Sequence, residues 1–239
     1  MRTFPDLLET VVPVANAAAR QLTTVANVKA MLGITDTSSD TLLGQLIDRV
    51  SGQIAGYCRL ARDVVGNRPT LGAESLRATW YAPTDFPNYV EFRNVNEYRR
   101  GPALYLPWRV PITAITGVTE DGTDLVLGTD YKFIGGFSGR LERLDAQGRP
   151  AFWSPNAIVV EFDCGWSLPT DVPPEIEAAC IDQIRYVFLG RKRDPAIRSE
   201  AVQEVATVSY SVPGGDAIGD SGLLPNVEAA LQDYRNPVP

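Results

Sequence analysis

Residues 39–60 read SDTLLGQLIDRVSGQIAGYCRL, and this stretch decides the fold. Its apolar side chains recur every three or four residues, the spacing of one face of an α-helix. That face carries Leu42, Leu43, Leu46, Ile47, Val50, Ile54 and Tyr57. Ser38 or Ser39 is a candidate cap for the start of the helix, which we expect to end near Leu60. A face this long and continuous predicts a helix that packs against other helices.

Three further helices are predicted around this one. Thr24 is a candidate cap for a helix that ends near Gly33, with Val25, Val28, Met31 and Leu32 at helical spacing. After residue 168, Asp171 is a candidate cap and two prolines fall in the permissive first turn. The apolar stripe that follows is Ile176, Ala179, Cys180, Ile184, Val187 and Phe188. A last helix is expected over about 225–235, with Val227, Ala230, Leu231 and Tyr234 on one face.

Between the two long helices the chain is rich in β-forming residues and interrupted by glycine and proline. We expect strands at 76–81, 103–106, 112–119, 124–127, 131–134, 140–143 and 157–162. Asp121-Gly122 is the clearest hairpin turn. Short strands at this spacing predict a small antiparallel sheet or barrel. We expect the four tryptophans, Trp80, Trp108, Trp153 and Trp166, to lie mainly in its core and rim.

The predicted fold class is therefore α+β: a small helical bundle with an inserted antiparallel β domain and an extended C-terminal segment ending in a short helix. We expect an N-terminal arm at 1–22, the bundle at 23–66 and 168–195, and the β-rich insert at 67–167. Residues 196–239 are expected to hold an extended segment at 205–212, a flexible glycine-rich loop and a C-terminal docking helix. The first residues lack the pattern of a signal peptide.

Composition argues against several functions. The 239 residues include no histidine, which removes the usual general base and the commonest metal ligand, so we expect no enzyme, no metal site and no cofactor. Three widely spaced cysteines predict buried free thiols. The net charge of -7 would repel DNA on average. No apolar run approaches the about 18–20 residues that a membrane span requires.

Two sets of charged residues can be interpreted either structurally or functionally. Asp121, Asp124 and Asp130 do not match a calcium loop and are interpreted as acids of hairpin loops. The basic run Arg191-Lys192-Arg193, with Arg185 and Arg198 nearby, fits the C-terminus of a helix. It also fits salt bridges to a neighbouring subunit and, less well, DNA contact. The last helix either folds back on its own bundle or docks on another chain.

Several short pieces of the sequence follow one another in a recognisable order. They are TTVANVKAML at 23–32, LYLP at 104–107, VPIT at 110–113, VTEDG at 118–122, DY at 130–131, VVEFDCG at 159–165, VPPEIEAA at 172–179, SE at 199–200, VSY at 208–210 and LPNVEAALQDYR at 224–235. Their order resembles the head–tail connector (adaptor) proteins of long-tailed bacteriophages and phage-like particles. The resemblance covers about residues 22–235 and excludes the arm, and Cys164 stands where alanine is more usual.

The resemblance implies a homo-oligomeric ring, usually of twelve subunits, beneath the portal protein at the head–tail interface of a virion assembled in the bacterial cytoplasm. The ring extends the DNA channel, through which DNA passes without sequence-specific binding, and joins the capsid to a stopper or tail protein. It implies portal docking by Leu223, Leu224, Val227, Leu231, Tyr234 and Arg235. Subunit contacts would involve Arg185, Arg191, Lys192 and Arg193.

Two alternatives remain open from the sequence. The first is a tail-completion or stopper protein, which belongs to the same structural class. The second is a surface binding module that uses the β insert, for example on a glycan. That alternative predicts exposed aromatic side chains, such as Trp108 or Trp153, on one strand face.

Overall fold

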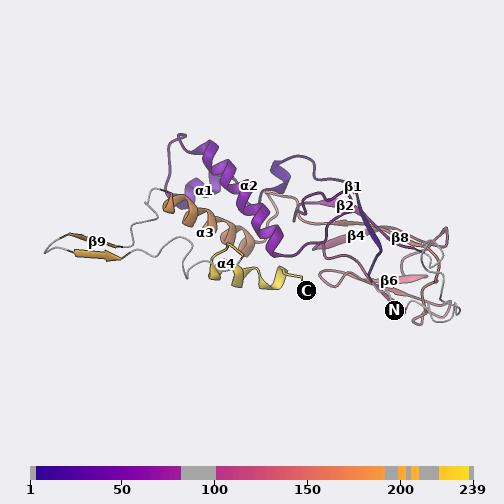
Figure 1. Ribbon diagram of the computed structural model, residues 1–239. Coiled ribbons are helices and arrows are strands. Elements are labelled where there is room, and N and C mark those ends of the chain that lie inside the picture. The colour runs from indigo at the N-terminus through magenta and orange to yellow at the C-terminus, as the bar shows by residue number, and fades with distance from the viewer. Residues whose placement is uncertain (1–3, 82–100, 192–198, 203–205, 210–220, 237–239) are drawn as a thin grey trace. The chain divides into compact units, whose positions relative to one another are not determined.

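The chain folds as two units, which Figure 1 shows as a helical part and a β-rich part. The computed structural model describes residues 4–81, 101–191, 199–202, 206–209 and 221–236. The β unit comprises residues 1–16 and 60–166, and the helical unit comprises residues 17–59 and 167–239. Helices in one unit and antiparallel sheets in the other confirm the predicted α+β class.

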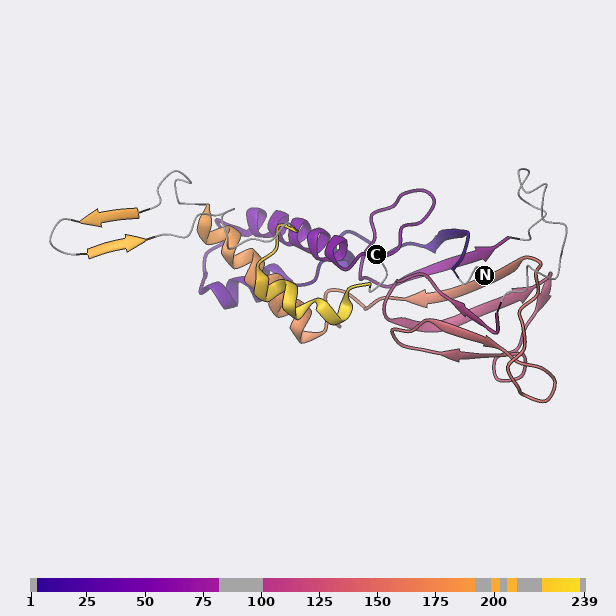
Figure 2. The same ribbon diagram turned by 60° about the horizontal axis from the view of Figure 1, so that its bottom comes forward.

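Within the described residues, the helical unit contains four α-helices. They are α1 (Val25–Leu32), α2 (Asp40–Tyr57), α3 (Pro174–Gly190) and α4 (Pro225–Ala230). Short 3-10 helices, η1 (Ala18–Arg20) and η4 (Gln232–Tyr234), lie at its two chain ends. Figure 2 shows α3 (orange) beside α2 (purple), and α4 (yellow) packs against α3. The fully buried apolar side chains of this unit are Val28, Leu43, Ile47, Val50, Ile54, Cys58, Ile176, Cys180, Ile184, Leu223, Val227 and Leu231.

The ends of the predicted helices agree with the structure where local chemistry sets them. Thr24 Oγ1 accepts a hydrogen bond from the Asn27 amide at 3.2 Å, and Gly33 ends α1 with a φ of 68°. α2 ends at Tyr57 instead of near Leu60, and Arg59 beyond it adopts a φ of 53°. Asp171 does not cap α3, because the helix begins later, with Pro173 as its N-cap residue.

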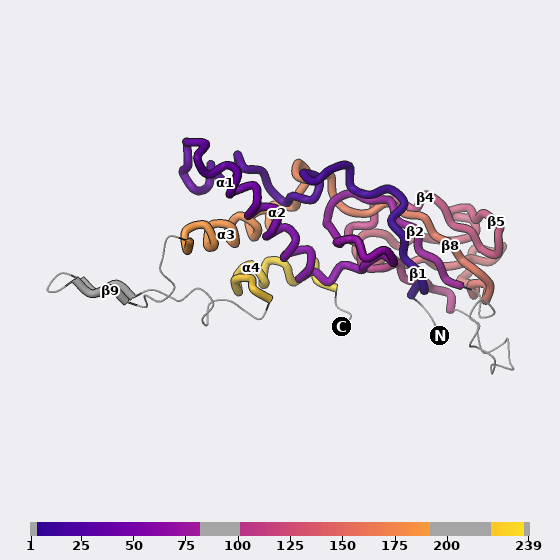
Figure 3. Tube along the Cα trace, turned by 45° about the horizontal axis from the view of Figure 1, so that its top comes forward, coloured from indigo at the N-terminus to yellow at the C-terminus, as the bar shows by residue number. Residues whose placement is uncertain are grey.

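The described residues of the β unit form two antiparallel sheets. The larger has the strand order β1-β2-β8-β4-β5 (Figure 3), and the smaller has the order β3-β7-β6. The strands of the larger sheet are β1 (Leu7–Val12), β2 (Glu74–Trp80), β4 (Ile112–Glu120), β5 (Thr123–Asp124) and β8 (Ile158–Cys164). Those of the smaller are β3 (Ala103–Tyr105), β6 (Tyr131–Ile134) and β7 (Arg140–Arg143).

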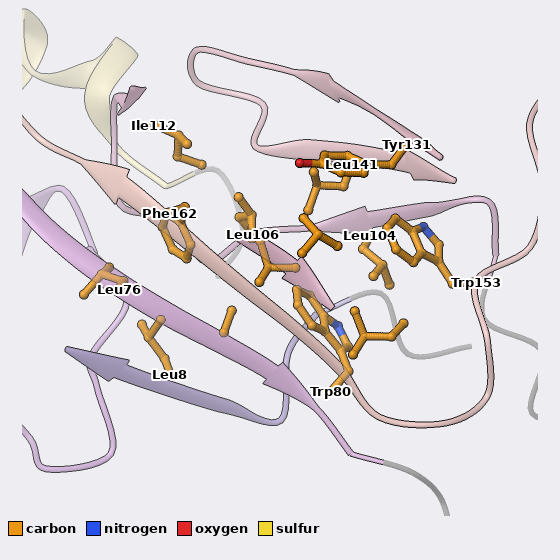
Figure 4. Packing of buried hydrophobic residues seen from close by; sticks show 14 of the residues in the cluster. Leu8, Leu76, Trp80, Leu104, Leu106, Ile112, Tyr131, Leu141, Trp153 and Phe162 are labelled. Atoms are coloured by element: carbon orange, nitrogen blue, oxygen red, sulfur yellow. The ribbon is translucent and has the colours of Figure 1, made fainter. Parts of the chain in front are cut away.

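The core of the β unit lies between the faces of these two sheets (Figure 4). Strand β8 alternates strictly, with Ile158, Val160, Phe162 and Cys164 buried and the residues between them half-buried. The smaller sheet contributes Leu104, Tyr131 and Leu141, and the large rings of Trp80 and Trp153 fill the space between. Large aromatic side chains bury much apolar area, which explains how short strands form a stable core.

The turn at Asp121-Gly122 is the predicted hairpin. Both residues have positive φ, 52° and 75°, as a tight two-residue turn between antiparallel strands requires. The strand expected at 124–127 is shorter than predicted, since β5 ends at Asp124. The Val126 amide instead donates to the Asp130 carboxylate at 2.8 Å, which closes a turn over residues 126–130.

Residues expected to form an N-terminal arm belong to regular structure. Leu7–Val12 forms the edge strand β1, which pairs antiparallel with β2 from Leu7↔Thr79 to Val12↔Ser75. The local sequence gave little sign of this strand, because its pairing partner lies far along the chain. Residues 17–20 contribute instead to the helical unit.

A separate two-stranded antiparallel sheet is formed by residues that fall between α3 and α4 in the sequence. Its strands are β9 (Ser199–Val202) and β10 (Ala206–Ser209). β10 covers part of the extended segment predicted at 205–212, and the remainder of that segment lies outside the described residues. The predicted glycine-rich loop also lies outside them, apart from Ser221 and Gly222.

Candidate functional site

The C-terminal segment, residues 221–236, carries most of the side chains implicated in docking. It comprises α4, η4 and their flanks; α4 packs on α3, and the segment contacts Tyr57 at the end of α2. The Leu223, Val227 and Leu231 side chains are fully buried there, and Tyr234 is 9 % exposed. Leu224 and Arg235 are half-buried. Of the two placements that the sequence left open for this helix, the structure shows the one on its own bundle.

Gln183 of α3 holds the beginning of the segment. Its side chain is 1 % exposed, its Nε2 donates to the Gly222 carbonyl at 3.1 Å, and its Oε1 accepts from the Leu224 amide at 2.9 Å. Both polar ends of the buried amide are thereby satisfied, as burial demands. The sequence carried a signal for this contact, because Gln183 is a polar residue within the apolar stripe of α3.

The end of the segment is held by contacts to α2 and α3. The Tyr234 hydroxyl donates to the Glu175 carboxylate, and this bond lowers the pKa of Glu175, while burial raises the pKa of Tyr234. The Arg235 guanidinium lies 4.9 Å from the centre of the Tyr57 ring, which is cation–π range. Residues Glu175, Gln183 and Tyr57 are therefore parts of this site that the sequence interpretation missed.

Replacing Gln183 by leucine is expected to loosen the beginning of the segment. The Gly222 carbonyl and Leu224 amide would lose their partner, which costs about 1–3 kcal/mol of unfolding free energy. Urea unfolding followed by circular dichroism at 222 nm measures the loss, and amide hydrogen exchange should rise first in residues 222–234. Gln45→Leu, at an exposed position of α2, is the matched control. Equal stability of the two variants would contradict the role of Gln183 in holding Gly222 and Leu224.

The basic residues predicted at a subunit interface are only partly within the described chain. Arg185 and Arg191 are exposed, and the Arg191 guanidinium lies 3.7 Å from the centre of the Phe188 ring. Lys192 and Arg193 lie outside the described residues. The exposed positions of Arg185 and Arg191 leave them accessible to another chain, and their role in subunit contacts stays a prediction.

All three cysteines are free and buried. Burial raises the pKa of each thiol, of Cys58, Cys164 and Cys180, to about 12. At neutral pH the thiols are therefore protonated and shielded. We expect 5,5′-dithiobis(2-nitrobenzoate) to label none of them in the native protein and all three in denaturing urea. Rapid labelling of the native chain would contradict this arrangement.

The β unit contains a buried ion pair that lies apart from the docking residues. Arg109 Nη1 donates to Glu74 Oε2 at 2.8 Å, with the side chains 1 % and 3 % exposed. The Nε and Nη2 atoms of Arg109 have no hydrogen-bond partner among the described residues. The pair links β2 to the segment before β4, and its closed surroundings indicate a role in holding the fold together.

Two of the acidic hairpin residues support local turns. The Asp124 carboxylate accepts from the Thr119 hydroxyl and the Asp130 carboxylate accepts from the Val126 amide, so both support local turns. Within the described ranges, no cluster of three or more Cys, Asp or Glu side chains is arranged to hold a metal ion. In those same parts of the chain, no helix is long and apolar enough to cross a membrane.

The tryptophans bear on the glycan-binding alternative. Trp153 is 1 % exposed, and its indole Nε1 donates to the Pro102 carbonyl at 3.2 Å. Trp108 is half-buried, with its ring centre 6.5 Å from that of Phe137. A buried ring has no face free for stacking on a sugar, so Trp153 does not supply the exposed aromatic surface that this alternative predicts.

Comparison with known proteins gives one family match and several structural likenesses. The fold is similar to a chain from the neck of an empty gene transfer agent particle computed with C6 symmetry, with a TM-score of 0.51 and 15% identity over 96% of this chain and 95% of that chain. A chain from the virion of a native gene transfer agent particle aligns with a TM-score of 0.48 and 14% identity, over 96% and 95% of the two chains. No curated protein matches.

The family match is to the phage gp6-like head-tail connector protein family, and it covers residues 22–100. This range includes α1, α2 and β2 but not the edge strand β1. It therefore contains the stretch at 39–60 from which the helical unit is built. Over residues 22–100 the chain carries the sequence pattern of the phage gp6-like head–tail connector family, which confirms the resemblance inferred from its sequence.

Proposed function

We propose that this chain is a structural adaptor subunit that forms a ring beneath the portal of a phage or phage-like particle. The observation that carries the proposal is the family match over residues 22–100, which coincides with the helices that organise the helical unit. The shared fold with a chain of a gene transfer agent neck supports it over nearly the whole length. The ring extends the DNA channel and joins the capsid to the stopper or tail, a mechanical role without catalysis.

The net charge of -7 suits such a channel, because an acidic lumen repels the DNA phosphates during packaging and genome ejection. Electron microscopy of the full chain, alone and mixed with the portal protein of its particle, tests the proposal. We expect rings, or rings stacked on portal rings. Failure to join the portal in the mixture would overturn the proposal. A monomer in isolation, by contrast, agrees with assembly templated by the portal.

Portal docking is assigned to the C-terminal segment through Leu223, Leu224, Val227, Leu231, Tyr234 and Arg235. Because most of these side chains are buried on α2 and α3, docking through them requires the segment to leave its own unit. Gln183→Leu weakens the closed arrangement and should therefore tighten portal binding. Unchanged binding after deletion of residues 222–239 would refute the anchor.

A further inference from the structure

One exposed apolar patch lies along the edge strand of the larger sheet. The side chains of Val11, Val12, Val64 and Val65 are 46%, 55%, 57% and 80% exposed. They come from two adjoining segments, because the Val64 amide donates to the Leu8 carbonyl at 2.9 Å and Thr10 Oγ1 donates to Asp63 Oδ2 at 2.8 Å. These four residues are called the valine patch. Several large apolar side chains exposed together, unlike single ones, mark interaction sites.

A second exposed apolar patch follows β5. Val126 and Leu127 are 59% and 56% exposed, at the turn that Asp130 closes. These two residues are called the β5-turn patch. Two hydrogen bonds of 2.8 Å hold the turn. The Val126 amide donates to the Asp130 carboxylate, and the Asp130 amide donates to the Val126 carbonyl. The two side chains are thus presented on an ordered turn.

The two patches lie at opposite edges of one sheet. The strand order β1-β2-β8-β4-β5 places the valine patch beside the first strand and the β5-turn patch beside the last. Figure 3 shows β1 and β5 on opposite sides of β2, β8 and β4. Both patches belong to the β unit, and each adjoins an edge strand of the same sheet.

The charges around the patches are of opposite sign. Arg62 and Arg68, both exposed, flank Val64 and Val65 in the chain. Asp121 and Asp124, also exposed, precede Val126 and Leu127. Glu9 of β1 is half-buried and lies opposite Arg77 of β2, whose guanidinium donates to the Glu161 carboxylate. Among the exposed charged residues, the valine patch thus has a basic rim, Arg62 and Arg68, and the β5-turn patch has an acidic one, Asp121 and Asp124.

We propose that the valine patch of one subunit docks on the β5-turn patch of a neighbouring copy of this chain. The proposal rests on the ring proposed above, because a closed ring of identical subunits needs two different, complementary surfaces on opposite sides of each subunit. Opposite charges at the two rims set the register, while the valines, Val126 and Leu127 are removed from water. The assignment gives a role to residues 1–16, which precede the family match.

Cysteine cross-linking tests the contact directly. The double variant Val65→Cys/Leu127→Cys, in full-length rings or portal-bound rings, should yield a ladder of covalent oligomers with a short bismaleimide. The single variants Val65→Cys and Leu127→Cys are matched controls and should yield none, because the proposed contact joins position 65 to position 127. The native cysteines are buried and give no background.

The outcomes separate this inference from the proposed function. Rings without a ladder would overturn the docking assignment and leave the ring intact. A dimer from Val65→Cys alone, or a cross-link from position 65 to the portal or tail protein, would assign the patch to another contact and also overturn it. If the chain forms no rings and does not bind the portal, both the docking assignment and the proposed function are overturned.

Charge reversal provides a second measurement. Arg62→Glu/Arg68→Glu and Thr123→Arg/Asp124→Arg should each reduce ring yield about tenfold at physiological salt, and the quadruple variant should restore it. Asp121 is left unchanged because its φ of 52° disfavours most other residues. Phe152→Ser removes an apolar side chain that is 60% exposed outside both patches and should have no effect. Equal loss in all variants, with no restoration, would contradict the pairing.

Discussion

Replacing Glu74 by alanine is expected to lower the unfolding free energy of the protein by about 3–5 kcal/mol, because it leaves the buried Arg109 cation without its partner. The distance from Arg109 Nη1 to Glu74 Oε2 is 2.8 Å, and both side chains are almost fully buried. Two other nitrogens of that guanidinium already lack partners among the described residues, so no nearby acceptor is in place to compensate. Urea unfolding followed by tryptophan fluorescence measures the loss, since all four tryptophans lie in the β unit.

The same strand supplies a matched control. Arg77 of β2 pairs with Glu161 of β8 at 2.7 Å, but both side chains are 42% exposed. Exposed pairs contribute little, so Glu161→Ala should cost less than about 1 kcal/mol. Replacing both members of the buried pair, as in Glu74→Leu/Arg109→Met, should recover most of the stability, because it removes the unpaired charge. A Glu74→Ala variant no less stable than Glu161→Ala would show that the buried pair does not hold the β unit.

Replacing Leu231 by alanine is expected to destabilise the helical unit by about 2–5 kcal/mol, the range for removing a fully buried leucine side chain. Leu231 has no exposed surface and is followed by Tyr234, which hydrogen-bonds to Glu175. The cavity left by the substitution would lie beneath the C-terminal segment. Circular dichroism at 222 nm during urea unfolding measures the effect, because the α-helices of three or more turns all belong to this unit.

Gln232→Ala is the control for that substitution, since Gln232 is exposed in the same segment and should change stability by less than about 0.5 kcal/mol. The comparison also bears on portal docking. A large loss for Leu231→Ala means that the free subunit keeps the segment closed, so that docking through Leu231 competes with its own fold. A loss as small as that of the control would mean that the segment spends much of its time away from α2 and α3.

The parts of the fold predicted correctly from sequence are those set by neighbouring residues. The cap at Thr24, the glycine end of α1 and the apolar face of α2 depend on residues within one or two helical turns, and all are present. The Asp121-Gly122 turn is equally local. By contrast, Asp171 was a reasonable cap by residue type, but the start of α3 was set by Pro173 and Pro174.

The sequence alone determined the α+β class, the helices, most strands of the insert and the resemblance to head–tail connectors, because each depends on periodicity or motif order along the chain. Only the tertiary structure showed that residues 7–12 pair with β2, that Gln183 holds Gly222 and Leu224, and that Glu74 meets Arg109. Each of these contacts joins residues far apart in sequence, and no local pattern specifies which distant partner a strand edge, amide or charge will meet. The apolar face predicted for the stretch at 39–60 required packing partners, and in the tertiary structure α1 and α3 pack against α2.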